Sequence, residues 1–427
     1  SKKINDTITS NDEVKFNKEG LYNYLYYGYS VFGQTPLENV KFMKPSSRLI
    51  KLDNGELLEE KLPDPLEKFI DYKLSENDLI ELIQERVQKW ESKVPKRSNI
   101  ILPLSGGFDS RLLLWCLKDK DRINSYTYGL SEDQSKSTET VHARKLAELY
   151  NLNWSQVKIG NFHSYIRNWY NEFGISTHTH GMYHFEFYNK IRNTLKGEHS
   201  FLSGIFGDVF AGNVKTQKIE SSDQLIKLGY VHGLCANPSK LKINCEFNLR
   251  DKFWMENKEN LKDYRYQIIT TIRLKIMLIS YLIKIPSLFS FNTWSPYLDI
   301  DIAMAMLNLP KERRLNRKWQ IDFFKKNNLY LEGQNLKSDN KNLLNLVATL
   351  NQPLIPLDAK LLSSLIDEDY VIWINKNIKL NNFNKFKGKL FRIPKLSRIF
   401  KELGFQSFWN AYSAYLTLKP LEMFLKK

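Results

Sequence analysis

The middle of the chain alternates two kinds of hydrophobic pattern. Short apolar runs, which predict buried strands, are followed by longer segments in which apolar residues recur every three or four positions, as on one face of a helix. This alternation predicts an α/β fold in which a parallel, twisted sheet is flanked by helices. The expected strands are 99–104, 123–130, 154–159 and 199–205, and the expected helices are 110–119, 137–151 and 183–196.

The two ends of the chain carry different patterns. Residues 1–65 are rich in strand and turn signals, and a β-hairpin is expected from 48–52 and 56–58, which flank the turn sequence Asp-Asn-Gly at 53–55. Beyond about residue 220 the strand signals fade and helical runs dominate, separated by loops rich in Asn and Lys. A small β-rich part and a helical part are therefore expected on either side of the α/β region.

A helix is expected over 75–93, because its apolar residues recur at helical spacing and Ser75 is a suitable N-cap. This helix leads into the α/β region. The division that follows has three parts: a β-rich segment at 1–70, an α/β domain at 71–330 and a helical, basic region at 331–427.

Composition narrows the class of protein. The hydrophobic fraction of 42% over 427 residues indicates a globular chain with a sizeable core, and not a disordered one. Cys116, Cys235 and Cys245 form no CxxC pair, which argues against a structural zinc site and fits a reducing compartment. The most apolar segment, 276–283, has eight residues, whereas a bilayer-spanning helix needs about 20. We expect a cytoplasmic protein.

The net charge of +16 leaves several kinds of partner open. It suits RNA, an anionic membrane or an acidic small substrate, and it also suits a basic surface that is only solvated. DNA is not an expected partner. Residues 385–401 mix basic and apolar side chains, so this segment either contacts a membrane peripherally or covers the domain as a solvated helix.

The chemistry-bearing motif lies at the seam between the first strand and the first helix of the α/β region. Ser105, Gly106 and Gly107 end the strand, and Asp109 and Ser110 begin the helix. Glycines let backbone N–H groups approach phosphate oxygens, and the helix N-terminus adds partial positive charge. A carboxylate suits such a site when it holds Mg²⁺ against the phosphates. A capped turn is the structural alternative, and no Walker A motif occurs in the chain.

This Ser-Gly-Gly-x-Asp-Ser string resembles the pyrophosphate loop of the ATP pyrophosphatase superfamily. The resemblance implies an adenine nucleotide α-hydrolase-like fold, with ATP and Mg²⁺ as cofactors. It also implies cleavage of ATP between the α- and β-phosphates, with transfer of AMP to a substrate oxygen.

Three further stretches resemble the asparagine synthetase-like enzymes of this superfamily. The resemblance implies that the backbone near Tyr128 and Gly129 meets adenine, that Gly204 lies near the nucleotide and that Asp208 joins Asp109 in holding Mg²⁺ through pyrophosphate. It assigns charge neutralisation on the phosphates to Lys318, although the basic residues around it also allow an alignment shifted to Arg317. The stretches are 125–159, 201–213 and 295–324.

The chain departs from that family at its N-terminus. The family carries an N-terminal glutaminase domain whose nucleophile is a cysteine at the first position, whereas Ser1 stands here and 20–63 resemble only the last part of such a domain. The first cysteine, Cys116, lies within a predicted helix and is expected to be a core thiol. Either the chain is trimmed or the protein has no glutaminase. It would then take ammonia or another amine from solution, from a separate glutaminase or from the substrate itself.

A second departure concerns the general base. Ile205 stands where the family usually has a glutamate that deprotonates the nitrogen nucleophile, and where β-lactam-forming relatives have a tyrosine. A cluster of His178, His180, His184 and Glu186 precedes this strand. Its imidazoles suit three roles. One of them, with His180 as the candidate, could act as the general base; the cluster could bind a metal ion; or its side chains could be polar groups that line a loop.

These features together predict an AMP-forming ligase that adenylates a carboxylate and transfers nitrogen to it. The leading hypothesis is amidation of a uronic acid-type sugar carboxylate, free or linked to a carrier, in surface polysaccharide biosynthesis. Macrolactam formation in a peptide, as in lasso peptide cyclases, is the alternative within the class. An RNA-modifying enzyme and a catalytically inactive nucleotide-binding module are the alternatives from other classes.

Overall fold

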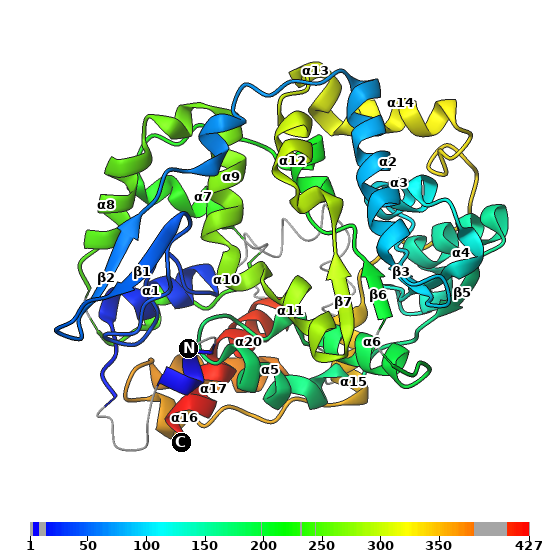
Figure 1. Cartoon of the computed structure of the whole chain (residues 1–427). Coiled ribbons are helices and arrows are strands. Elements are labelled where there is room, and N and C mark those ends of the chain that lie inside the picture. The colour runs from blue at the N-terminus through cyan, green and yellow to red at the C-terminus, as the bar shows by residue number, and fades with distance from the viewer. Residues whose placement is uncertain are drawn as a thin grey trace.

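A computed structural model shows an α/β protein built on one five-stranded parallel sheet (Figure 1). The strand order is β5-β4-β3-β6-β7, and every neighbouring pair is parallel. The strands are β3 (Ile100–Pro103), β4 (Ile123–Thr127), β5 (Asn153–Gln156), β6 (His199–Leu202) and β7 (Phe291–Trp294). The structure describes residues 3–7, 14–197, 199–230, 233–243, 245–379 and 408–426.

The sequence pattern located four of these five strands, and the prediction of a parallel sheet with flanking helices is confirmed. The expectation that strands end near residue 220 was wrong, because β7 forms an edge of the sheet beside β6. β7 has four residues, of which only Phe291 is fully buried, so it lacks the continuous apolar run of a central strand.

Alternate side chains of the sheet enter two separate cores. Ile100 and Leu102 of β3 belong to one hydrophobic cluster, whereas Ile101 belongs to the other. This period of two follows from the pleat of the strand. The first face is covered by α2 (Glu76–Lys93), α3 (Phe108–Cys116), α4 (Thr138–Tyr150), α12 (Ile300–Leu307) and α14 (Lys318–Lys326). The second is covered by α5 (Ile166–Phe173), α6 (Tyr183–Arg192), α15 (Leu344–Asn351), α17 (Glu368–Asn377) and α20 (Phe408–Leu425).

The predicted helix over 75–93 is confirmed as α2, and the Ser75 hydroxyl accepts the backbone N–H of Asp78 as its N-cap.

Cys116 is fully buried in the first core and forms no disulfide, as expected of a core thiol. Burial raises the pKa of its thiol to about 12.

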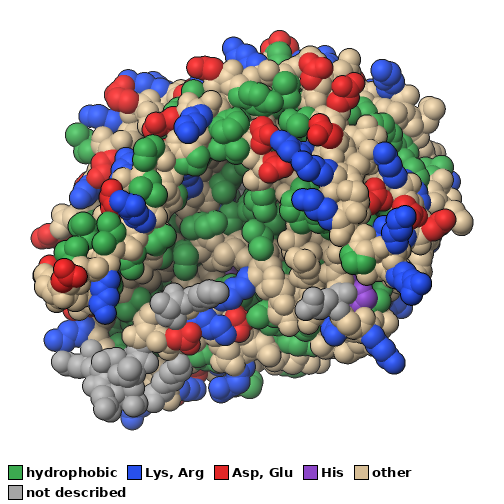
Figure 2. All heavy atoms as spheres, in the orientation of Figure 1, with side chains coloured by type: hydrophobic (Ala, Val, Ile, Leu, Met, Phe, Trp, Pro, Cys, Tyr) green, Lys and Arg blue, Asp and Glu red, His purple; other side chains and the backbone are tan. Residues whose placement is uncertain are grey.

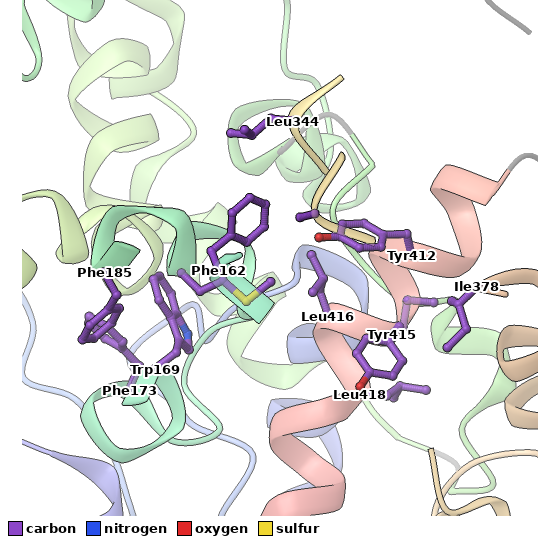
Figure 3. Packing of buried hydrophobic residues seen from close by; sticks show 14 of the residues in the cluster. Phe162, Trp169, Phe173, Phe185, Leu344, Ile378, Tyr412, Tyr415, Leu416 and Leu418 are labelled. Atoms are coloured by element: carbon purple, nitrogen blue, oxygen red, sulfur yellow. The ribbon is translucent and has the colours of Figure 1, made fainter. Parts of the chain in front are cut away.

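The C-terminal helix α20 is a core element and not a surface helix. Figure 3 shows its side chains, among them Tyr412 and Leu416, gathered with Phe162 in the second core. His163 joins this packing, because its Nε2 lies 2.9 Å from the Tyr412 hydroxyl. The membrane or solvent role expected for 385–401 concerns residues outside the described part of the chain.

The N-terminal segment is less β-rich than expected. The predicted hairpin is confirmed as β1 (Ser47–Lys51) and β2 (Leu57–Lys61), but α1 (Lys18–Tyr27) is a helix in place of the expected strands. Asn17 caps α1 by accepting the backbone N–H of Gly20, and Leu21 and Leu25 are fully buried in the second core.

Short helices occupy the part of the chain between β6 and β7, as the sequence predicts for this region. They include α7 (Ile226–Gly229), α8 (Asn248–Asn257), α9 (Tyr264–Leu274), α10 (Ile276–Ile279) and α11 (Tyr281–Leu288). Figure 2 shows a hollow with many hydrophobic atoms between this helical side and the side that carries β7 and α12. No helix in the described part of the chain is both long and apolar enough to cross a membrane.

Candidate functional site

The order of the strands creates a topological switch point at the centre of the sheet, where a crevice is expected between the loops of neighbouring strands. The chain leaves β3 toward β4 and β5, and it then returns to the other side of β3 as β6. The loops that follow β3 and β6 therefore run away from the sheet in opposite directions. Ligands of open α/β sheets bind at such a switch point, outside the carboxyl ends of the strands. Both glycine-rich segments singled out in the sequence, 105–110 and 203–208, lie here.

The loop after β3 exposes hydrogen-bond donors at the start of α3. Gly106 has a left-handed backbone with φ of 70°, and a Cβ there would lie 2.3 Å from the Cβ of His142, so only glycine fits. Ser105 and Gly107 are exposed, whereas Ser110 is buried. The Ser105 hydroxyl lies 3.3 Å from the Gly107 nitrogen and 3.4 Å from the Ser110 hydroxyl. The predicted loop residues thus form one compact turn, with Ser105 and Gly107 on its exposed side.

An ion pair between a buried arginine and a partly exposed glutamate supports this loop. Arg111 is fully buried, and its guanidinium donates to both carboxylate oxygens of Glu332 at 3.0 and 2.8 Å and to the carbonyl of Gly106. The rings of Phe108 and Phe324 lie 5.2 and 5.1 Å from the guanidinium carbon. This pair was not predicted from the sequence, although an arginine next to the apolar run Leu112–Leu114 was a signal of a buried charge that needs a partner.

The loop after β6 packs directly onto Asp109. A Cβ on Gly207 would lie 2.6 Å from the Asp109 carboxyl carbon, and a Cβ on Gly204 would lie 3.4 Å from its Cβ. Phe206, between these two glycines, has a φ of 65°, which is a strained conformation for a bulky residue. Asp208 follows at once, and its Oδ2 accepts from the Asn213 side chain at 3.3 Å. The structure therefore brings together Asp109 and Asp208, as the sequence predicted.

The environment of Asp109 raises its pKa to about 6. Burial is the main cause, the positive charge of Arg317 acts in the opposite direction, and the negative charge of Asp208 raises the pKa further. Arg317 forms an ion pair with this carboxylate, and Gln320 also lies against it. Two carboxylates and one guanidinium thus meet at the crevice, where a cation and a polyphosphate would find opposite charges.

The structure places Lys318 differently from Arg317. Lys318 is exposed at the first position of α14. The hydrogen bond from Arg313 is the main cause that lowers the pKa of Asp322, one turn further along the helix, and the positive charge of Lys318 adds a smaller effect in the same direction. The cation in contact with Asp109 is therefore Arg317. This is the residue that takes the place of Lys318 when the alignment with the family motif is shifted by one position.

The stretch that resembles the third family motif ties the two loops together. The Ser295 hydroxyl donates to the carbonyl of Ile205 at 3.2 Å, and the Tyr297 hydroxyl donates to the carbonyl of Asp109 at 3.2 Å. Both side chains are buried and lie on the segment between β7 and α12. This segment therefore fixes the position of the loop after β6 relative to the start of α3.

Tyr128 and Gly129 lie one strand away from the phosphate-type loop, just beyond the end of β4. The register pairs Tyr126 with Pro103, so Tyr128 is level with Ser105 at the same edge of the sheet. Gly129 is close-packed, since a Cβ there would lie 2.3 Å from the carbonyl oxygen of Gln134. These two residues therefore border the crevice from the β4 side.

The histidine cluster lies behind Tyr128, whose ring centroid is 6.5 Å from that of His184 and 5.8 Å from that of Tyr183. Burial lowers the pKa of His180 to about 4 and that of His184 to about 3. Imidazoles with such pKa values are neutral and weakly basic near pH 7, which favours the interpretation that they line the site.

A metal role for the cluster is not supported by its surroundings. Glu186 accepts the backbone N–H groups of Gly160 and Asn161 at 2.9 and 2.8 Å and pairs with Lys190 at 2.7 Å. Its oxygens are therefore engaged in structural contacts. In the described ranges of the chain, no three His, Cys, Asp or Glu side chains are grouped so that they could hold a metal ion.

Comparison with known proteins gives no family for this chain. No protein-family model matches the sequence, and no curated protein matches it either. The assignment of function therefore depends on the site itself.

Proposed function

We propose that the protein is an ATP-dependent, AMP-forming amide ligase with an adenine nucleotide α-hydrolase-like fold. The observation that carries this proposal is the meeting of two glycine-rich loops at the switch point of the sheet, with Asp109, Asp208 and Arg317 between them. A capped turn alone would explain Asp109 or Ser110, but not a second carboxylate and a cation brought to the same place by distant segments.

The residues present fit a magnesium-bound triphosphate. The exposed backbone of Gly107 and the exposed hydroxyl of Ser105 offer donors for phosphate oxygens, at the start of α3. Gly204 and Gly207 leave no side chain in the crevice beside Asp109. Asp109 and Asp208 would hold Mg²⁺, which supplies neutralising charge for the departing pyrophosphate.

The proposed reaction has two steps. A carboxylate oxygen of the substrate attacks the α-phosphorus of ATP, and the bond from that phosphorus to the bridging oxygen breaks, so that pyrophosphate leaves with the electron pair. A nitrogen nucleophile then attacks the acyl carbon, AMP leaves, and the nitrogen loses a proton. The chain contributes mainly by positioning and electrostatics: Ser105 and Gly107 orient the phosphates, and Arg317 provides positive charge beside them.

We propose a sugar carboxylate as the acceptor, because a basic protein without a glutamate at Ile205 suits an anionic substrate other than free aspartate. ATP–pyrophosphate exchange tests this on the full chain. The panel contains uronic-acid nucleotides, precursor-like peptides and aspartate, each with Mg²⁺-ATP. Exchange with a uronic acid supports the proposal. Exchange with a peptide favours macrolactam formation, and the absence of exchange with every carboxylate favours an inactive nucleotide-binding module.

The affinity for Mg²⁺-ATP is expected to fall as the pH drops below about 6. Burial raises the pKa of Asp109 to about 6, so acid converts the carboxylate needed for Mg²⁺ into its neutral form. The affinity is expected to fall by about tenfold per pH unit below that value. Isothermal titration calorimetry between pH 5 and 8 measures it.

The nucleotide phosphate also titrates near pH 6, so the wild type is compared with Asp109→Asn. The variant should keep only the pH dependence that belongs to the nucleotide. Equal pH profiles for the two proteins would contradict the role assigned to Asp109.

A further inference from the structure

The guanidinium of Arg317 lies at the position where Mg²⁺ is proposed to bind. Its Nη2 donates to Oδ1 of Asp109, and its Nε donates to Oε1 of Gln320 at 2.6 Å. The Arg317 and Asp109 side chains are only 14% and 16% exposed. A carboxylate held in this way has one oxygen committed to a guanidinium in surroundings where water competes poorly.

Three local features hold the Arg317 side chain in place. The backbone of Asn316 and that of Arg317 are both left-handed, with φ of 53° and 59°. Two consecutive non-glycine residues in this region are unusual. The guanidinium carbon lies 4.9 Å from the centroid of the Phe108 ring, at the start of α3. The contact with Asp109 is thus fixed by the turn before α14, by Phe108 and by Gln320.

We propose that Arg317 excludes free divalent metal ions from Asp109 and releases this carboxylate only when a nucleoside triphosphate offers it another anion. An arginine stays charged, so it needs a partner in any state of the site. A metal ion alone would leave the guanidinium beside a second positive charge, whereas phosphate oxygens accept its planar donors. The metal therefore enters with the nucleotide and is not a resident ion. This inference rests on the proposed function.

Binding of Mn²⁺ alone tests the proposal, with no nucleotide present. Free Mn²⁺ is followed by electron paramagnetic resonance in titrations of the full-length wild type, Arg317→Gln and Arg317→Gln/Asp109→Asn. Arg317→Gln is expected to bind one Mn²⁺ about 10–100-fold more tightly than the wild type, the range for losing one charge-assisted hydrogen bond. The double variant is expected to lose this tight site. Arg317→Met, which keeps the contact with Phe108, gives the same test if the glutamine variant does not fold.

Two results would overturn the inference. One is equal Mn²⁺ affinity in the wild type and a folded Arg317 variant, and the other is a tight Mn²⁺ site that survives Asp109→Asn. Titrations of the wild type with Mg²⁺-ATP distinguish failure of the inference about Arg317 from failure of the proposed function. If the wild type binds Mg²⁺-ATP while the Mn²⁺ results are negative, only the role of Arg317 is wrong. If the wild type does not bind Mg²⁺-ATP, the proposed function is wrong.

Discussion

Replacing Asp109 with asparagine is expected to weaken the binding of Mg²⁺-ATP by about 10–100-fold, while the affinity for ATP without metal stays the same or rises. The carboxylate faces Asp208 and pairs with Arg317. Its removal takes away a proposed metal ligand, and the lost charge-assisted contact corresponds to that range. It also leaves Arg317 free to meet phosphate oxygens, so metal-free nucleotide gains a cation. Calorimetric titrations with and without Mg²⁺ measure both affinities.

Asp119→Asn is the matched control, because Asp119 is exposed just beyond α3 and its side chain makes no capping hydrogen bond. This variant should bind Mg²⁺-ATP as the wild type does. If Asp109→Asn retains wild-type affinity for Mg²⁺-ATP, or if both affinities fall together, Asp109 does not act through the metal.

Removing the carboxylate of Glu332 is expected to destabilise the fold strongly. Arg111 is fully buried, and Glu332 is the carboxylate that neutralises it. A buried guanidinium cannot lose its proton, so Glu332→Ala leaves an uncompensated charge in the core. The expected loss in the free energy of unfolding is about 3 kcal/mol, the lower end of the range for broken buried pairs, because Glu332 is partly exposed. Chemical denaturation measures this loss.

The double variant Arg111→Met/Glu332→Ala should recover most of the lost stability, because it removes the buried charge together with its partner. Glu148→Ala is the control: Glu148 forms an exposed pair with Lys145 at 3.4 Å, and its loss should change the free energy of unfolding by less than about 1 kcal/mol. If Glu332→Ala and Glu148→Ala have the same effect, the ion pair behind the loop does not support it.

The regular part of the fold was predictable because local pattern and tertiary structure agree there. β3 and β4 are buried along almost their whole length, and the glycine-rich loops that follow β3 and β6 were located from sequence. The edge strand β7 and the helix α1 were missed because tertiary contacts decide the structure of both segments. β7 has four residues and is fixed by its pairing with β6, whereas α1 is stabilised by its Asn17 cap and by burial of Leu21 and Leu25.

The candidate site was predictable only where it lies within a motif. The resemblance to the family motifs implied that Asp109 and Asp208 lie together. In the structure each follows a strand of one parallel sheet, and such loops meet at the same edge. The partners that come from distant segments were not predictable in this way. Glu332 reaches Arg111 from 221 positions away, and the turn at 316–317 decides that Arg317 and not Lys318 faces Asp109. Such contacts depend on backbone geometry that cannot be inferred from the local pattern of hydrophobic and polar residues.

The proposed nucleotide site can be seen directly in a crystal structure with Mg²⁺ and an ATP analogue that cannot be cleaved between the α- and β-phosphates. We expect the phosphates to lie between the loop at 105–107 and the loop at 204–208, with Mg²⁺ near Asp109 and Asp208 and with Arg317 turned from Asp109 to the phosphates. A nucleotide bound elsewhere, or no nucleotide at saturating concentration with the Asp109–Arg317 pair intact, would contradict this expectation.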